Sequence, residues 1–133
     1  AGVPQERLIE FPVAEEMQCG ASIGLALAGY VPICIYPRWN FLLLAANAIV
    51  NHLDKLCEIS TWKPRVLIRV GVGSEKPLHP GPQHSGDMTE AFRLLLRNVQ
   101  VIKLIDPADV MPAYDAAMKR EGATMFVETM DLY

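Results

Sequence analysis

Residues 15–36 read Glu-Glu-Met-Gln-Cys-Gly-Ala-Ser-Ile-Gly-Leu-Ala-Leu-Ala-Gly-Tyr-Val-Pro-Ile-Cys-Ile-Tyr and carry no charge after Glu16. Pro32 interrupts this run, because proline lacks the backbone N–H that a helix interior needs. The pattern favours a buried helix over residues 15–28, a turn, and a buried strand over residues 31–36, rather than a membrane span. A continuous apolar strand of this kind is typical of a parallel sheet covered on both faces.

Further strands and helices alternate along the rest of the chain. We expect strands at residues 7–10, 66–70, 99–105 and 124–128, and helices at residues 40–59, 88–97 and 106–122. Asn40 has a side chain suited to cap the first of these helices. The loop over residues 71–87 is long for a compact domain, so we expect it to be functional or mobile. Alternating elements predict an α/β fold, a three-layer α-β-α domain with a mostly parallel sheet, and residues 1–133 as a single domain.

The composition excludes several classes of protein. Of the 133 residues, 51% are hydrophobic and 20% are charged, which excludes a disordered chain. The net charge is -3 and no Lys/Arg-rich block occurs, which excludes nucleic-acid binding through a basic face. Cys19, Cys34 and Cys57 form no C-x-x-C pair, which indicates reduced thiols. Together with the lack of a signal-peptide pattern in residues 1–7, this predicts a cytoplasmic location.

Two glutamates open the first expected helix. A carboxyl group at the head of a buried helix needs a partner, since taking charge out of water is costly, whereas an acidic first turn that complements the helix dipole is the simpler alternative. Glu15 and Glu16 point about 100° apart, so one can be buried while the other is solvated. Gly20, Gly24 and Ala28 share one face of the helix, where another backbone could come close.

His84 lies in the loop over residues 71–87 between proline and glycine residues. A histidine so placed is suited to proton transfer near neutral pH, although a structural or exposed histidine is the commoner case. His79 precedes it by five residues, but no third ligand is near in sequence, so we expect no metal site in this chain.

Aromatic and glycine residues mark two strand ends. Trp39 and Phe41 stand where a strand meets a helix, and a ring there can either stack on a flat heterocycle or plug the core. Gly71 and Gly73 follow a strand but lack the third glycine and the helix start of a phosphate-binding fingerprint.

The order of these features along the chain is more specific than any one of them. They are Arg7 to Glu15, Gly20 and Gly24, Leu27 to Ile33, Asn40-Phe41, Val50-Asn51, Gln83-His84-Ser85 and Ile105 to Asp109. This order resembles the pyrimidine-binding, transketolase central-type domain of thiamine-diphosphate enzymes. Within that group the chain is most similar to the E1 β subunit of 2-oxo acid dehydrogenases.

The resemblance implies a role for three residues. Glu15 matches the glutamate that hydrogen-bonds the cofactor's aminopyrimidine ring and activates it, so it is both catalytic and cofactor-binding. Phe41 matches the aromatic residue that packs on that ring. His84 matches the catalytic histidine near the reacting carbon, where it stabilises or relays protons to a developing alkoxide. The implied activity is decarboxylation of a 2-oxo acid with thiamine diphosphate as electron sink.

The chain also departs from the family pattern. It has no Gly-Asp-Gly motif, because Gly86-Asp87 is followed by Met88. We therefore expect Mg²⁺ and the cofactor's diphosphate to be held by a partner, an E1 α-like subunit, in a homo-oligomer or heterotetramer, with no nucleic-acid or membrane partner. Pro37-Arg38-Trp39 stands where the family usually has smaller or aromatic residues, and Arg38 could change substrate contacts. The family's first strand and helix have no counterpart before Ala1, so we expect a domain truncated at its N-terminus, with an exposed sheet edge.

Three alternatives stay open at this point. The chain could be a transketolase-like enzyme piece, or a non-catalytic interaction module that keeps the fold. It could also be an unrelated doubly wound domain that binds a nucleotide near Gly71 and Gly73. Which 2-oxo acid or ketose is used does not follow from the sequence.

Overall fold

Four strands form one parallel sheet, in the order β1-β2-β4-β3, in a computed structural model that describes residues 2–73 and 79–132. The strands are β1 (Ile33–Tyr36), β2 (Leu67–Val72), β3 (Gln100–Leu104) and β4 (Thr124–Thr129). The α-helices are α1 (Glu15–Leu27), α2 (Trp39–Leu42), α3 (Leu56–Ile59), α4 (Pro82–Ser85), α5 (Thr89–Leu95) and α6 (Pro107–Lys119). The predicted α/β class and the parallel sheet are confirmed.

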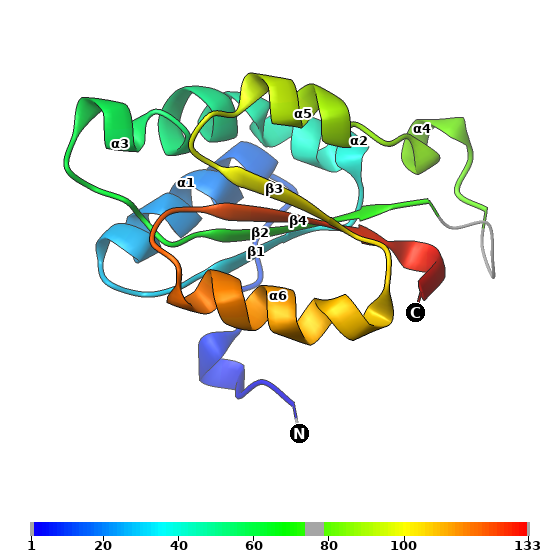
Figure 1. The fold of residues 1–133 in the computed structure, drawn as a ribbon, viewed down its shortest axis with the longest axis horizontal. Coiled ribbons are helices and arrows are strands. Elements are labelled where there is room, and N and C mark those ends of the chain that lie inside the picture. The colour runs from blue at the N-terminus through cyan, green and yellow to red at the C-terminus, as the bar shows by residue number, and fades with distance from the viewer. Residues whose placement is uncertain (1, 74–78, 133) are drawn as a thin grey trace.

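The helices cover the two faces of the sheet unequally (Figure 1). On one face lie α1, the helical run from α2 to α3, and α5, and on the other lies α6. The larger core lies between the sheet and α1, the helical run from α2 to α3, and α5, and it includes Trp39, Leu42, Ile49, Phe92 and Met125. The smaller core lies beneath α6 and consists of Leu67, Leu104, Ala117 and Phe126. These are the three layers expected from the alternating pattern.

Two expectations were wrong, one for the outer strand β1 and one for residues 7–10. Burial alternates along β1, and Ile33 and Ile35 are each 50% exposed, because α6 packs over the other strands and not over β1. Residues 7–10 form no strand. A 3-10 turn occupies Gln5–Arg7, and the exposed segment after it pairs with no strand of the described chain. A short extended segment is stable only when it is paired and packed.

The helix expected over residues 40–59 is broken into pieces. It begins as α2, continues as a 3-10 turn (Leu43–Ala45) and a π-helical turn (Ala48–Leu53), and ends as α3. The N-cap is Arg38 and not Asn40, so the capping expectation was wrong. The wide turn lies directly before Asp54, whose N–H bonds to the Ile49 carbonyl at 2.9 Å.

The expected loop over residues 71–87 is shorter in the structure. β2 continues to Val72, and α4 forms near the far end of the segment. Residues 74–78 lie outside the described part. Within the described ranges, no helix is long and apolar enough to cross a bilayer.

Asp54 is fully buried and organises the start of β3. Its Oδ1 accepts hydrogen bonds from the backbone N–H groups of Arg97, Asn98 and Val99 at 2.9, 2.7 and 3.0 Å, and its Oδ2 accepts one from Lys55 at 2.9 Å. Burial by itself raises the pKa of a carboxyl group, but these bonds outweigh that effect and hold the pKa of Asp54 below its ordinary value.

Asp54→Asn is expected to lower the free energy of unfolding by about 3 kcal/mol, because neutralising the acceptor weakens three buried hydrogen bonds. Urea denaturation measures this, and Glu90→Gln, an exposed acid that bonds Arg93 outside this cluster, is the control. A carboxyl group with a lowered folded-state pKa stabilises the fold above its unfolded pKa, near 3.8, and less as the pH falls below it. Equal acid sensitivity of the native and Asp54→Asn chains would contradict this role.

Two glycines predict opposite effects of one substitution. A Cβ on Gly71 would lie 2.6 Å from the backbone oxygen of Pro37, so Gly71→Ala is expected to cost about 1–3 kcal/mol of stability through overpacking. Gly20 is exposed in α1 with no atom within 4 Å of such a Cβ. Gly20→Ala is therefore expected to add about 0.5–1 kcal/mol. Thermal denaturation of both variants checks the sign, and a stable Gly71→Ala chain would contradict the close approach of Pro37.

Candidate functional site

The carboxyl ends of the parallel strands lie at one edge of the sheet, and the predicted site residues gather there. α1 runs antiparallel to β1, so its first residue lies over the last residue of that strand. The Tyr36 hydroxyl donates to the backbone oxygen of Glu15 at 3.1 Å, and Gln18 Nε2 donates to the oxygen of Ile35 at 2.9 Å. Glu15 is thereby positioned at the carboxyl edge.

The two glutamates at the head of α1 have different surroundings, as their angular offset predicts. Glu15 is 9% exposed, and no hydrogen bond or ion pair joins its carboxyl group to another described residue. Glu16 is exposed and accepts a hydrogen bond from Asn47 Nδ2 at 2.9 Å. Glu15 thus presents an unpartnered acid at the edge of the core, whereas Glu16 makes an ordinary surface contact.

Tyr36 and Cys19, which lie near the head of α1, are buried and stay protonated. Burial raises the pKa of Tyr36, and the neighbouring thiols of Cys34 and Cys19 add to the rise. The phenol therefore keeps its proton and remains a hydrogen-bond donor to Glu15. Burial likewise raises the pKa of the Cys19 thiol to about 12, so that this group stays neutral.

His84, Asn40 and Phe41 form a cluster at the same edge. The His84 ring stacks on Phe41 with ring centres 5.7 Å apart and planes 20° apart. His84 Nδ1 lies 3.0 Å from Asn40 Oδ1, and because an amide oxygen only accepts, Nδ1 is the donor. In neutral His84 the proton is therefore on Nδ1, which leaves Nε2 as a base.

The other aromatic residue of this segment has a structural role. Trp39 is 1% exposed and packs against Phe92 with ring centres 5.0 Å apart. Of the two expectations for an aromatic residue here, Trp39 fits the core plug. Its indole N–H is buried and has no hydrogen-bond partner within the described residues.

Arg38 links the ends of the two strands. Pro37, the first residue after β1, packs closely against Gly71 at the end of β2. The next residue, Arg38, donates a hydrogen bond from its guanidinium to the backbone oxygen of Gly73. The close packing against Pro37 and Met130 explains the glycine at position 71 without a phosphate contact, which disfavours the nucleotide-binding alternative. Arg38 is half-buried and forms no ion pair with a described carboxylate.

The structure therefore joins His84 to Phe41 and places Glu15 at the same edge, and no hydrogen bond or ion pair of the described residues joins Glu15 to His84. Sequence reasoning missed the bonds that Asn40 and Tyr36 make. The sequence signal for a site role of Asn40 was its position as a polar residue just after the end of a strand. A helix-capping role explains the same position equally well.

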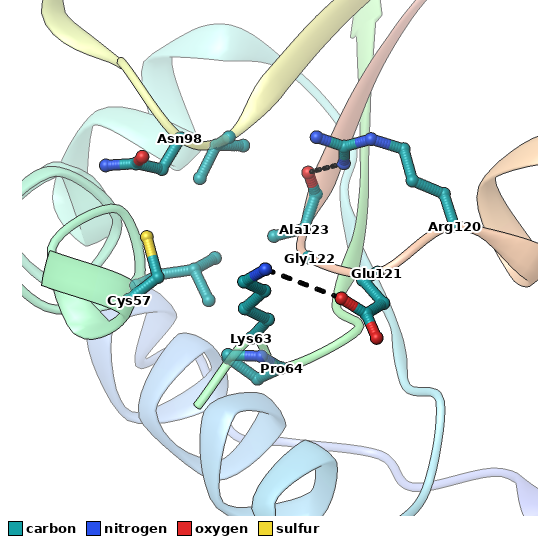
Figure 2. A pocket seen from close by; sticks show the side chains of 10 residues that line it. Cys57, Lys63, Pro64, Asn98, Arg120, Glu121, Gly122 and Ala123 are labelled. Carbon is teal, nitrogen blue, oxygen red and sulfur yellow. Dashed lines mark hydrogen bonds and ion pairs between the residues drawn. The ribbon is translucent and has the colours of Figure 1, made fainter. Parts of the chain in front are cut away.

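A hollow of about 230 Å³ lies at the opposite edge, where β3 and β4 begin (Figure 2). Its rim includes Cys57, Lys63, Asn98 and Arg120 and none of the predicted site residues. Arg120 donates to the Ala123 carbonyl at 3.0 Å, and the rim also covers the end of α6, where cations complement the helix dipole. Among residues 2–73 and 79–132, no three His, Cys, Asp or Glu side chains gather as metal ligands would.

The fold and this edge define a parallel α/β domain with an unpartnered acid, a histidine and an aromatic ring at the carboxyl ends of its strands. The model of the family described as "Transketolase, pyrimidine binding domain" matches residues 2–133. The chain belongs to this family.

Similar proteins include β subunits of the pyruvate dehydrogenase E1 component. The chain is 27% identical to that of Chlorokybus atmophyticus over 131 residues, covering 97% of this chain and 38% of the relative. It is 30% identical to that of Chaetosphaeridium globosum over 129 residues, covering 96% and 39%. The mitochondrial protein of Caenorhabditis elegans is 26% identical over 128 residues, covering 96% and 36%. The chain thus spans less than two-fifths of these relatives.

The names of some relatives give their location. They include mitochondrial and chloroplastic proteins, so the expected cytoplasmic location stays a prediction.

Asn40→Ala is expected to remove the preference of His84 for the Nδ1–H tautomer, because Nδ1 loses its acceptor. Nitrogen-15 NMR of the imidazole reports the tautomer directly. Asn47→Ala, which removes an exposed amide bonded to Glu16, is the matched control and is expected to leave the His84 signals unchanged. A native chain in which Nε2 carries the proton would contradict the assigned bond.

Proposed function

We propose that this chain is an E1 β-like part of a thiamine-diphosphate-dependent 2-oxo acid dehydrogenase, which binds and activates the cofactor's aminopyrimidine. The observation that carries the proposal is Glu15, a residue that is 9% exposed and whose carboxyl group forms no hydrogen bond or ion pair with the described residues. A ring nitrogen bound beside it would supply a hydrogen-bond partner.

The residues at this edge fit such a cofactor. Glu15 would hydrogen-bond a ring nitrogen, and Phe41 offers a half-buried aromatic face to a flat ring. His84, held through Nδ1, keeps Nε2 free to take or give a proton near the reacting carbon. When bound, thiamine diphosphate supplies the electron sink for decarboxylation.

A partner subunit is part of the proposal. Residues 1–133 carry no Gly-Asp-Gly motif, and an E1 α-like chain would hold Mg²⁺ and the diphosphate, in a heterotetramer or another oligomer. The relatives carry the name of one subunit of a larger component, which supports this arrangement.

Glu15→Gln is expected to weaken binding of thiamine diphosphate and Mg²⁺ by the chain with an E1 α subunit at least about 10-fold, by removing a charge-assisted hydrogen bond. Isothermal titration calorimetry measures the affinity. Glu16→Gln is the matched control, since its carboxyl group is exposed and bonded to Asn47.

The same titration separates the alternative of a non-catalytic interaction module. That module predicts assembly with the α subunit but the same weak cofactor binding in the native chain and in Glu15→Gln. Unchanged affinity in Glu15→Gln, with assembly intact, would overturn the enzymatic proposal.

A further inference from the structure

Arg38 is the cation nearest in sequence to the Asn40–His84–Phe41 cluster. No ion pair joins it to a described carboxylate, and the nearest acid shown at its acceptor Gly73 is Asp131. The guanidinium is half-buried, and its acceptor there is the neutral backbone oxygen of Gly73. Other arginines of the chain pair with acids, as Arg69 does with Glu128 and Arg93 with Glu90. A partly desolvated cation at the edge that holds the candidate site therefore has capacity for an anion.

The shape and position of this group narrow the choice of anion. A guanidinium carries five N–H donors in a planar fork that matches the two oxygens of a carboxylate, and the Gly73 carbonyl occupies one nitrogen. Arg38 directly precedes α2, two residues from Asn40, which holds the proton-transferring histidine. An anion bound by Arg38 would thus lie at the carboxyl ends of the strands, where this cluster also lies.

We propose that Arg38 binds the carboxylate of the 2-oxo acid substrate and so selects an acid over a neutral carbonyl compound. This inference rests on the proposed function and adds to it a specificity-determining residue. The Gly73 carbonyl fixes the guanidinium in place, and Gly71 allows the chain that carries Arg38 to lie close over β2.

The ion pair with Arg38 would act on substrate binding and not on the decarboxylation step. In decarboxylation the bond between the carboxyl and carbonyl carbons breaks, its electron pair stays on the former carbonyl carbon, and neutral carbon dioxide leaves. An ion pair to the carboxylate therefore belongs to the bound substrate and weakens as the charge moves away. Loss of Arg38 is thus expected to raise KM without lowering kcat.

Two other roles give different results in the test. Arg38 could serve only to tie the ends of β1 and β2, in which case no small anion responds to it. It could instead bind the phosphate of a sugar phosphate, which is the substrate class of a transketolase-like enzyme. Pyruvate, hydroxyacetone and inorganic phosphate distinguish these roles, because they present a carboxylate, a neutral carbonyl and a phosphate.

The experiment is a titration of the 133-residue chain with each probe, followed by the NMR signal of the Arg38 Nε–H. Pyruvate is expected to shift this signal saturably, hydroxyacetone to leave it unchanged, and phosphate to bind more weakly than pyruvate. Arg38→Met is expected to weaken pyruvate binding, followed by the His84 ring signals, at least about 10-fold, and Arg38→Lys to give an intermediate loss. Thermal denaturation establishes that each variant is folded.

Arg65→Met is the matched control. Arg65 also donates to a backbone oxygen, that of Met118 at 3.1 Å, but at the opposite edge of the sheet. Its loss is expected to leave pyruvate binding unchanged. An equal loss in Arg65→Met, no response of Arg38 to pyruvate, or tighter binding of phosphate than of pyruvate would each overturn the assignment.

The cofactor titration keeps the two proposals apart. Arg38→Met is expected to bind thiamine diphosphate with the α subunit as the native chain does. If Arg38→Met loses the cofactor as well, Arg38 is a structural or cofactor-binding residue and the substrate assignment fails. If Glu15→Gln binds cofactor normally while Arg38 still binds pyruvate, the proposed function fails and the anion site stands.

Discussion

The parallel direction of all four strands is the constraint on which the candidate site depends. Each strand delivers its last residue to one edge of the sheet, and a helix packed antiparallel to its neighbouring strand has its first residue there. Glu15, Arg38 and His84 therefore reach one edge although they are far apart in sequence. Cys19, Cys34 and Cys57 are free, so no disulfide contributes to this convergence.

The bonds at this edge hold side chains in place without neutralising them. Tyr36 binds the backbone oxygen of Glu15 and leaves its carboxyl group free. Asn40 occupies Nδ1 of His84 and leaves Nε2 as a base. Gly73 accepts from one nitrogen of Arg38 and leaves its charge intact. Each group is thus oriented before any ligand binds, which is the arrangement that a binding or catalytic site requires.

Hydrophobic periodicity predicted the elements of the interior, and it failed where burial depends on a distant segment. The helix that begins at Glu15 and the strand that begins at Thr124 were predicted with nearly correct ends, because their patterns are local. The exposure of Ile33 and Ile35 was not predicted, since nothing in β1 shows that α6 covers only the other strands. The sequence predicts a capping role for Asn40. Its contact with His84 joins residues 44 positions apart, and no local pattern indicates such a contact.

The contrast between Asp54 and Glu15 supports the hypothesis that a ligand binds at the carboxyl ends of the strands. Asp54 is fully buried and accepts four hydrogen bonds, so its charge stabilises the loop before β3. Glu15 is 9% exposed, and its carboxyl group accepts none from the described chain. Burying a polar group without a partner costs free energy, and folded proteins keep such groups mainly where a ligand or partner completes them. Neither Glu15 nor Arg38 forms an ion pair with a described residue, and both lie where the strands end, so their shared position favours a ligand-binding site there.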